Sequence, residues 1–319
     1  MLLQSIELAV AAEELGADGA YFRVHHFANQ LASPFPLLAA IGARTSRIEV
    51  GTGVIDMRYE NPLYMAEDAG AADLISGGRL QLGISRGSPE QVVDGFRYFG
   101  YQPEAGSDHA ELAREHTRVF LEVIEGAGFA EPNPRPMFPN PPGLLRLEPH
   151  SPGLRNRIWW GAGTRDTAEW TARQRMNLMS STLLSEDTGV PFHQLQAEQI
   201  ERFRSAWKAS AWKTAGQERE PRVSVSRSIF PVVSDTDRAY FGREAASKDQ
   251  VGQLGGGTAR FGKTYAGEPD QLVKDLAEDE AVAAADTLLL TIPNQLGVDY
   301  NVHLLDSVLR YVAPELGWR

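Results

Sequence analysis

Short apolar segments alternate with longer segments of helical spacing along most of the chain. The first helical segment covers residues 3–15 and stops at Gly16, a residue type common just past a helix end. Strands are predicted at 20–24, 47–55, 79–84, 157–160, 176–182, 222–230 and 286–292. Helices are predicted at 3–15, 34–45, 62–75, 108–125, 164–174, 193–215, 236–248, 268–280 and 299–312. Strands that alternate with helices in this way predict a parallel sheet, because helical crossovers connect parallel strands.

Three segments interrupt this alternation. Residues 126–156 hold 8 of the 19 prolines, so regular structure cannot run through them, and we expect an excursion with a short β-hairpin near 143–149. The polar segment 85–107 is a candidate lid over a site. A flexible glycine-rich loop, including residues 255–257, is predicted between the helices 236–248 and 268–280. No internal repeat or domain boundary is evident, so residues 1–319 are predicted to form a single domain.

Two architectures fit this pattern, an open doubly wound sheet and a closed barrel. No G-x-G-x-x-G motif follows the first strand, which weakens a dinucleotide-binding interpretation. The length of 319 residues suits one α/β barrel of roughly 250 residues with insertions.

Composition excludes several classes of function. The absence of cysteine rules out disulfides, thiolate metal sites and cysteine nucleophiles, and the histidines lack metal-ligand spacing, so no metal is expected. The net charge of −11 argues against nucleic-acid binding. No apolar run approaches the roughly 20 residues of a membrane span, and residues 1–19 lack the basic region of a signal peptide. A cytoplasmic protein without membrane contact is the resulting expectation.

Four parts of the sequence together resemble the bacterial luciferase-like monooxygenase family. They are 14–27 with its histidine pair, 47–55 with the following run 61–87, 159–172, and the final strand and helix around 286–312. The resemblance covers nearly the whole chain and implies a (β/α)8 TIM-type barrel with insertions, with flavin at the carboxyl ends of the strands. Family members usually begin with a strand, and this first strand is missing from the chain start. We therefore expect either a gap closed by another element or a gene start upstream of Met1.

The histidine pair follows a predicted strand. Neutral imidazole can accept or donate a proton near physiological pH. In the family the first histidine faces the flavin and is implicated in proton transfer, which makes His25 the candidate catalytic residue. We expect His26 to pack or to cap the loop. The preceding position is often glutamate in the family, whereas here it is Val24, so that carboxylate is lacking.

A glycine-containing strand end offers close backbone approach to a planar ring. In the family the matching segment lies beside the isoalloxazine and contains a non-prolyl cis peptide, here the Gly53–Val54 bond. Thr52, Gly53 and Val54 are therefore candidate cofactor-binding residues, and a plain β-bulge is the structural alternative.

Two features are suited to a phosphate group. Arg86 follows the strand 79–84, and its guanidinium can donate two hydrogen bonds to a phosphate, as the family's arginine does at this position. A surface ion pair is the alternative. A loop at a helix N-terminus is a second anion site. Its members, to which the resemblance also assigns the phosphate, are Gly161, Ala162, Gly163, Thr164 and Thr167. The alternative for Thr164 is a simple helix cap.

The leading hypothesis is an FMN-dependent monooxygenase that uses reduced FMN and molecular oxygen to oxidise a small organic substrate. Such an enzyme acts on paired donors, and a separate flavin reductase is a possible partner because no nicotinamide site is evident. Self-association into a homo-oligomer is also expected. Two alternatives remain open: a deazaflavin-dependent oxidoreductase that transfers hydride on the same fold, and a non-catalytic flavin-binding protein.

Overall fold

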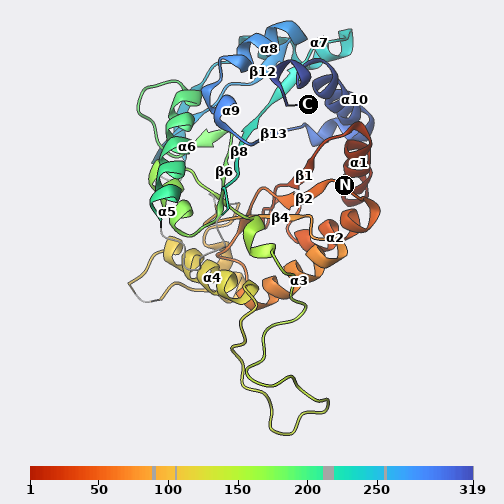
Figure 1. The fold of residues 1–319 in the computed structure, drawn as a ribbon. Coiled ribbons are helices and arrows are strands. Elements are labelled where there is room, and N and C mark those ends of the chain that lie inside the picture. Colours follow the sequence, from red (N-terminus) through yellow and green to blue (C-terminus); the bar gives the residue numbers. More distant parts are fainter. Residues whose placement is uncertain (88–90, 105, 211–218, 255–256, 319) are drawn as a thin grey trace. The chain divides into compact units, whose positions relative to one another are not determined.

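A computed structural model describes residues 1–87, 91–104, 106–210, 219–254 and 257–318 (Figure 1). The chain divides into two units. We call Gly19–Ile158 the N-unit, and Met1–Asp18 together with Trp159–Arg319 the C-unit. Among the described residues, no helix is long and apolar enough to cross a membrane.

The N-unit contains parallel strands in the order β1, β2, β4. Their bounds are Gly19–Phe22, Glu49–Thr52 and Leu80–Ser85, and the short β3 (Ile55–Asp56) also pairs with β4. All six residues of β4 are buried, which explains why this strand is a continuous apolar run in the sequence and not an alternating one. The helices α2 (Pro34–Arg44), α3 (Pro62–Ile75) and α4 (His109–Ile124) pack in succession, α2 on α3 and α3 on α4.

Helix α3 begins at a local cap, and contacts with residues distant in the sequence stabilise its C-terminal end. Asn61 caps the helix, because its side chain accepts hydrogen bonds from the amides of Leu63 and Tyr64, and Pro62 occupies the first turn. Near the other end, the buried carboxylate of Asp73 accepts hydrogen bonds from Ser151 Oγ (2.6 Å) and the Arg157 guanidinium. These contacts tie α3 to the chain that follows the proline-rich segment.

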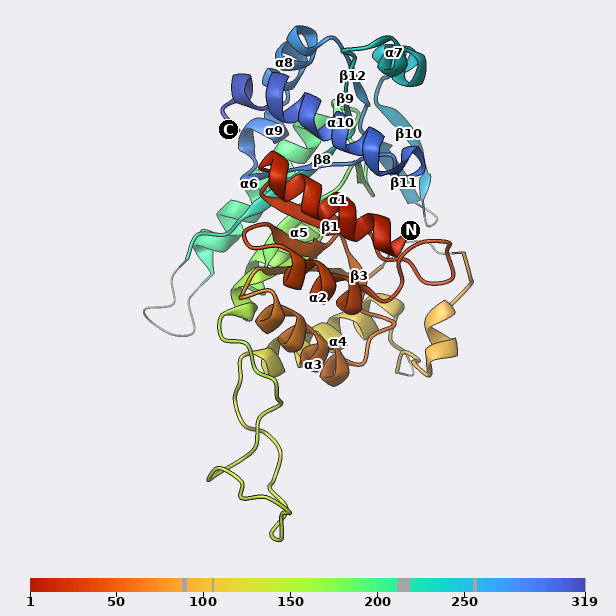
Figure 2. The same cartoon turned by 90° about the vertical axis from the view of Figure 1, so that its right-hand side faces the viewer.

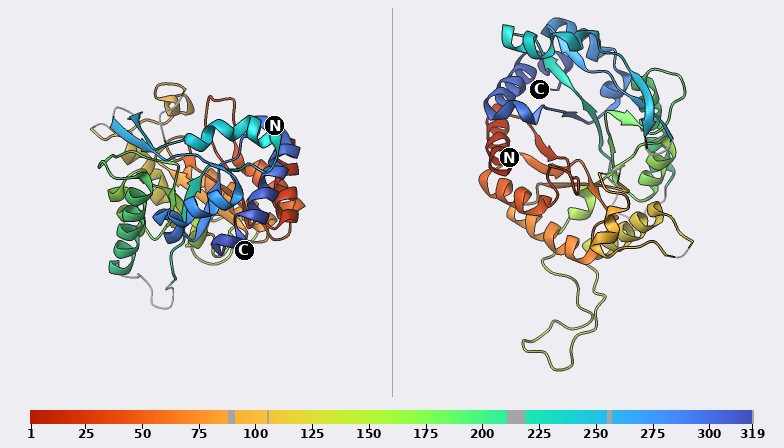
Figure 3. Two further views of the ribbon diagram at one scale, coloured as in Figure 1. Left: turned by 90° about the horizontal axis from the view of Figure 1, so that it is seen from above. Right: turned by 180° about the vertical axis from the view of Figure 1, so that it is seen from behind.

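The proline-rich segment extends away from α3 and α4, as the views in Figures 2 and 3 agree. The predicted hairpin at 143–149 is wrong: the segment contains only an isolated bridge between Ala130 and Leu145 among the described residues. Leu145 exchanges backbone hydrogen bonds with Ala130, outside the predicted hairpin, and Pro149 has no amide proton to donate to a hairpin ladder. Met137 and Phe138 lie exposed in this excursion.

The C-unit contains four parallel strands in the order β5, β6, β8, β13. Their bounds are Ile158–Gly161, Asn177–Ser180, Val223–Arg227 and Thr287–Leu290. Together with β1, β2 and β4 these are the seven strands expected from the sequence. Trp159 and Trp160 of β5 are almost completely buried, as core residues should be.

The helices of the C-unit come from both ends of the chain. Helix α1 (Leu2–Leu15) packs on α10 (Gly297–Tyr311), and Figure 2 shows the two side by side. Helix α5 (Arg165–Arg173) packs on α6 (Phe192–Ala209), and α6 packs on α9 (Glu280–Ala284). Part of the predicted helix 193–215 lies outside the described residues, as does the glycine pair 255–256.

Three predictions for the C-terminal third differ from the structure. The expected loop contains an antiparallel pair, β10 (Gln250–Leu254) with β11 (Gly257–Phe261), and β11 also pairs with β7 (Leu183–Leu184). Strand β12 (Tyr265–Gly267) pairs with β9 (Ile229–Pro231). The predicted helix 268–280 is in fact two helices, α8 (Pro269–Ala277) and α9, because Asp279 caps a new helix through the amides of Ala281 and Val282. Helix α7 (Asp235–Phe241) is shorter than predicted and continues as a 3-10 turn (Gly242–Ala246).

Candidate functional site

The candidate residues fall into both units. His25, Thr52, Gly53, Val54 and Arg86 belong to the N-unit, whereas Gly161, Ala162, Gly163, Thr164 and Thr167 belong to the C-unit.

His25 follows β1 and is held by a polar contact on its ring. Its backbone amide donates to the carbonyl of Leu31 (2.9 Å), and its Nε2 atom lies 3.3 Å from Nη2 of Arg23. Arginine can only donate, so Nε2 of His25 accepts and the proton of the neutral ring resides on Nδ1. This contact favours a neutral imidazole with Nε2 as its basic atom.

Burial and charge act in the same direction on His25. Partial burial lowers its pKa, and the neighbouring Arg23 cation lowers it further, while the Asp56 carboxylate opposes both effects. The pKa of His26 is also lowered, by burial first, with Asp56 opposing and His25 adding to the shift. Both rings are therefore neutral at pH 7.

His26 packs in an aromatic cluster. Its ring stacks on Tyr59 with 4.1 Å between ring centroids, and Phe99 meets it edge-on at 5.1 Å. Only 8% of His26 is exposed, and its Nε2 atom has no hydrogen-bond partner in the described part of the chain. The expected packing role matches this geometry, but the unpaired nitrogen leaves one polar atom for which the packing does not account.

A carboxylate near the histidines was not predicted from the sequence. Asp56 is buried at the end of β3, and its carboxylate accepts hydrogen bonds from the backbone amide and the Nε of Arg58, each at 3.0 Å through Oδ1. Gly87 packs directly on this ion pair: a Cβ atom there would lie 2.0 Å from Oδ2 of Asp56, and φ is +83°. Only glycine suits both conditions. The segment that carries Arg86 is thereby held against Asp56.

Glu60 is a second carboxylate that sequence analysis did not single out. Burial raises its pKa to about 7, and the nearby carboxylates of Asp56 and Asp68 act in the same direction. The signal in the sequence was its position, between a strand end and the helix cap Asn61, where barrel sites gather their side chains.

The predicted cis peptide is present between Gly53 and Val54. The amide of Gly53 donates to the carbonyl of Phe22 at the end of β1 (2.8 Å). Thr52 is fully buried, and its hydroxyl donates to the carbonyl of Gly83 (2.7 Å), so this hydroxyl proton is committed to the sheet. Within this group, a ligand would therefore meet backbone atoms more readily than the Thr52 hydroxyl.

Arg86 emerges from β4 into solvent. The residue is exposed, and its guanidinium forms no hydrogen bond or ion pair with another residue that the structure describes, although its charge contributes to lowering the pKa of Asp108. Before it, Ser85 Oγ accepts a hydrogen bond from the amide of Gly87 (2.9 Å), which shapes the turn. Both interpretations from the sequence, a phosphate ligand and a surface ion pair, therefore stay predictions for Arg86.

The loop from β5 to α5 forms the predicted helix cap. Thr164 Oγ1 accepts from the Thr167 amide (3.1 Å) and donates to Thr167 Oγ1 (2.8 Å). Gln199 Nε2 donates to the carbonyls of Ala162 and Thr164, both at 3.1 Å, and so fixes the loop on α6. A Cβ at Gly163 would lie 2.8 Å from Ser185 Oγ, which accounts for glycine there.

A protein carboxylate already occupies part of this helix N-terminus. Oε1 of Glu186 accepts a hydrogen bond from the backbone amide of Arg165 (2.9 Å), the first residue of α5, and also contacts the Arg165 side chain. A helix N-terminus favours negative charge, and Glu186 supplies some of it. A phosphate at this loop would share the helix with Glu186, so the fit to FMN is better at Arg86 than at α5.

Comparison with known proteins identifies the family. The sequence profile described as "Luciferase-like monooxygenase" matches residues 3–285. The chain therefore belongs to the luciferase-like monooxygenase family, as the resemblance in the sequence indicated.

The relatives within this family use more than one cofactor. The chain is 25% identical over 242 residues to the oxygenase component of a flavin-dependent trigonelline monooxygenase of Acinetobacter baylyi, covering 73% of this chain and 60% of that protein. It is 34% identical over 128 residues to an F420-dependent glucose-6-phosphate dehydrogenase of Gordonia bronchialis, covering 38% of this chain and 37% of that protein. The chain spans about half or less of the length of other curated relatives it matches.

Solved structures support the predicted fold. The monooxygenase RslO1 of Streptomyces bottropensis matches with a TM-score of 0.71 at 18% identity, over 99% of this chain and 93% of that one. The oxygenating constituent of 3,6-diketocamphane monooxygenase of Pseudomonas putida, a complex with FMN, also has a TM-score of 0.71, at 16% identity over 98% and 93%. The fold class is the expected TIM-type barrel with insertions, of which the structure describes the seven main parallel strands predicted from the sequence.

Proposed function

We propose that the chain is a flavin-dependent monooxygenase that binds reduced FMN and oxidises a small organic substrate with molecular oxygen. The observation that carries this proposal is the exposed Arg86 guanidinium, unpaired among the described residues, at the end of β4 in a luciferase-like chain. On a protein of net charge −11, an available cation at this position is a specific feature suited to the FMN phosphate.

The remaining candidate residues would act as follows. Arg86 would bind the phosphate. In the C-unit the Thr164 hydroxyl already donates to Thr167 Oγ1, so the Thr167 hydroxyl and the α5 N-terminus would be the donors to an anion. Thr52, Gly53 and Val54 present backbone close to a flat ring. Bound reduced FMN supplies the electrons with which oxygen is activated.

His25 is proposed to handle protons at its Nε2 atom. That atom now accepts a hydrogen bond from Arg23, so a proton can reach it only when this contact opens. With its pKa lowered by burial and by Arg23, the neutral ring is ready to accept a proton at pH 7.

A separate reductase is proposed as the source of reduced FMN. The curated relative from Acinetobacter baylyi is named as an oxygenase component, which implies a second component in that system. For this chain the same division of labour would explain a flavin site without a nicotinamide site.

Hydride transfer by a deazaflavin is a second candidate, favoured by the F420-dependent relative. Titration of the purified protein with FMN, riboflavin and F420, each oxidised and reduced, separates the two. We expect reduced FMN to bind in the micromolar range or tighter and free riboflavin weakly, followed by oxygen consumption in the presence of substrate. Preference for F420 would replace the monooxygenase proposal, and FMN binding without any turnover would favour a flavin-binding protein.

A further inference from the structure

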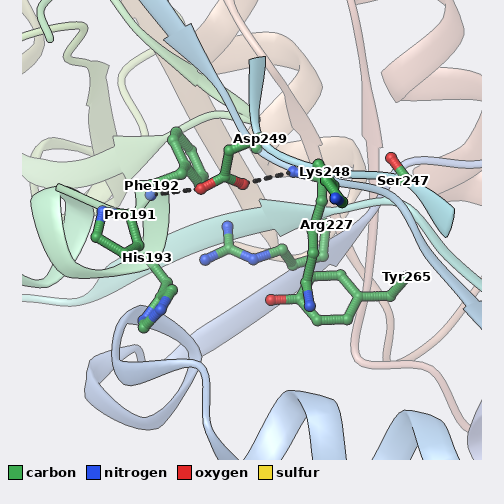
Figure 4. Close-up of a pocket in the computed structure, with 10 residues that line it drawn as sticks. Pro191, Phe192, His193, Arg227, Ser247, Lys248, Asp249 and Tyr265 are labelled. Carbon is green, nitrogen blue, oxygen red and sulfur yellow. Dashed lines mark hydrogen bonds between the residues drawn. The ribbon is translucent and has the colours of Figure 1, made fainter. Parts of the chain in front are cut away.

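The C-unit contains a cavity that shares no residue with the candidate flavin-binding set. It measures about 390 Å³ and lies where the start of α6, the end of β8 and the segments 247–249 and 262–265 come together (Figure 4). The residues that matter to its chemistry are Phe192, His193, Arg227, Lys248, Lys263 and Tyr265.

A buried salt bridge between Arg227 and Asp279 forms one side of the cavity. Arg227, 2% exposed, donates through Nε (2.8 Å) and Nη2 (2.9 Å) to the two carboxylate oxygens of Asp279. Tyr265 Oη also donates to Asp279 (2.6 Å), and two amides of α9 complete its coordination. Because Asp279 is fully used, this side is rigid and contributes no free negative charge.

Asp249 is likewise committed to the protein. Its Oδ2 atom accepts from the amide of Phe192 at the start of α6 (2.7 Å), and Oδ1 accepts from the amide of Lys263 (3.0 Å). Figure 4 shows both contacts above the space toward which the Arg227 guanidinium and the Tyr265 hydroxyl point. This carboxylate faces a helix N-terminus, which favours negative charge.

Two lysines of the lining have no acidic partner in the part of the chain that the structure describes. Neither Lys248 nor Lys263 forms an ion pair with any residue in the described ranges. Lys263 Nζ lies 4.7 Å from the centroid of the Tyr265 ring, and Lys248 is exposed at the rim. Glu280, which does not line the cavity, lies 4.0 Å from His193 Nδ1 and accepts a hydrogen bond from Gln194. The lining thus has three cations, Arg227, Lys248 and Lys263, and one carboxylate, Asp249, while Asp279 behind the lining balances Arg227.

The walls beside these cations are apolar and aromatic. Phe192 is 2% exposed and the Arg227 guanidinium lies over its ring at 5.3 Å. Gly262 passes close to it, since a Cβ there would approach within 2.6 Å of the Phe192 ring. Positive charge next to aromatic surface is the combination that a small organic anion requires.

We propose that this cavity is a second binding site, for a small organic anion whose carboxylate or phosphate contacts Lys248 and Lys263 while its apolar body lies against Phe192 and Tyr265. On a protein of net charge −11, such a site concentrates one class of metabolite at a defined place outside the candidate flavin residues.

Calorimetric titration of the full chain tests the proposal, with phenyl phosphate, benzoate, inorganic phosphate and neutral phenol as probes. Each is titrated at low and at high NaCl, with and without saturating FMN. We expect saturable binding of phenyl phosphate or benzoate, weaker binding of inorganic phosphate and none of phenol. Binding should weaken as NaCl rises and should be unchanged by FMN. The double variant Lys248→Gln/Lys263→Gln should weaken it about tenfold or more.

The matched control is Lys274→Gln, which removes an exposed lysine of α8 that does not line the cavity. It should leave anion affinity unchanged, and circular dichroism should show all variants folded. No saturable binding of either organic anion, or equal affinity in the double variant, would overturn the proposal. Competition by FMN would also overturn it, since the anion would then occupy the flavin phosphate site. Failure of FMN itself to bind concerns only the proposed function.

Discussion

Nη2 of Arg23 lies 3.3 Å from Nε2 of His25. The exposed arginine thus contacts the ring of the candidate catalytic histidine, which follows it by two positions in the sequence. The arginine has two effects on this ring. It fixes Nε2 as the acceptor, and its charge adds to burial in lowering the pKa of His25.

Replacing Arg23 should therefore raise the pKa of His25. In Arg23→Met the charge is gone, while burial still lowers the pKa and Asp56 still opposes it. NMR titration of the imidazole resonances in both proteins measures the change. Arg44→Met, at the exposed end of α2, should leave His25 unaffected. An identical His25 titration in Arg23→Met would show that the two side chains do not interact in solution.

Substitutions of the two histidines should have different effects, on turnover for His25 and on stability for His26. His25→Ala should retain FMN binding and lower turnover by about 10²–10⁴-fold, the range for loss of a general acid or base. His26→Ala should affect stability instead, because it removes a ring stacked on Tyr59. Steady-state kinetics with thermal unfolding distinguishes the two. Should His26→Ala be inactive while His25→Ala turns over normally, the catalytic assignment belongs to His26, whose Nε2 atom is buried and unpaired among the described residues.

Glu60 gives a pH-dependent prediction for stability. Its pKa is raised from an ordinary 4.5 to about 7, so between these values the folded chain holds a proton that the unfolded chain has lost. The free energy of unfolding should therefore fall as pH rises from 4.5 to about 7, and this loss of stability should persist above pH 7. Glu60→Gln removes the charge and should raise the unfolding temperature at pH 8 by a few degrees, with little gain near pH 4.

Thermal unfolding from pH 4 to pH 8 measures this difference. Glu104→Gln, at an exposed position, is the control and should show no such dependence. If Glu60→Gln raised the unfolding temperature by the same amount at every pH, the destabilisation would come from burying a polar group and not from its ionisation.

Apolar patterning was sufficient to predict the parallel strands and most helices, and the cap at Thr164 was expected from the sequence. The caps Asn61 and Asp108 were not predicted, although both belong to the residue types that commonly cap helices. Strands β10 and β11 were missed because exposed residues such as Val251 give them no apolar face. These strands form through backbone hydrogen bonds between β10, β11 and β7, which a pattern of apolar and polar residues does not predict.

The candidate site was predicted only as far as residue type allows. Glycines, a histidine pair and Arg86 stand out by chemistry and by the family resemblance. Asp56 and Glu60 did not, because a lone carboxylate in a sequence resembles an exposed one until burial is known. Glu186 was missed for another reason: it reaches the α5 N-terminus from 21 positions along the chain.

Arg86 should contribute to affinity for FMN through its phosphate. A charge-assisted hydrogen bond contributes about 1.5–3 kcal/mol, so Arg86→Ala should weaken FMN by about 10- to 150-fold. Its exposure favours the lower end, because solvent screens the charge. Thr164→Ala removes a hydroxyl and a helix cap, and should weaken FMN binding by less, about 1 kcal/mol of binding free energy. Riboflavin, which lacks the phosphate, should bind both variants as it binds the parent, and equal weakening of riboflavin and FMN would assign Arg86 to the fold.

Glu186 should oppose FMN binding if the phosphate uses the start of α5. Its carboxylate occupies the Arg165 amide at 2.9 Å and places a negative charge where the helix would otherwise attract an anion. Glu186→Gln keeps a carbonyl acceptor for that amide but removes the charge, so FMN should bind several-fold more tightly while riboflavin is unchanged. Glu198→Gln is the matched control, because Glu198 also pairs with the Arg165 side chain but does not contact that amide. Fluorescence titration of FMN measures all three proteins. If both variants tighten FMN equally, the effect comes from the freed Arg165 guanidinium, and if neither does, the phosphate does not use the α5 N-terminus.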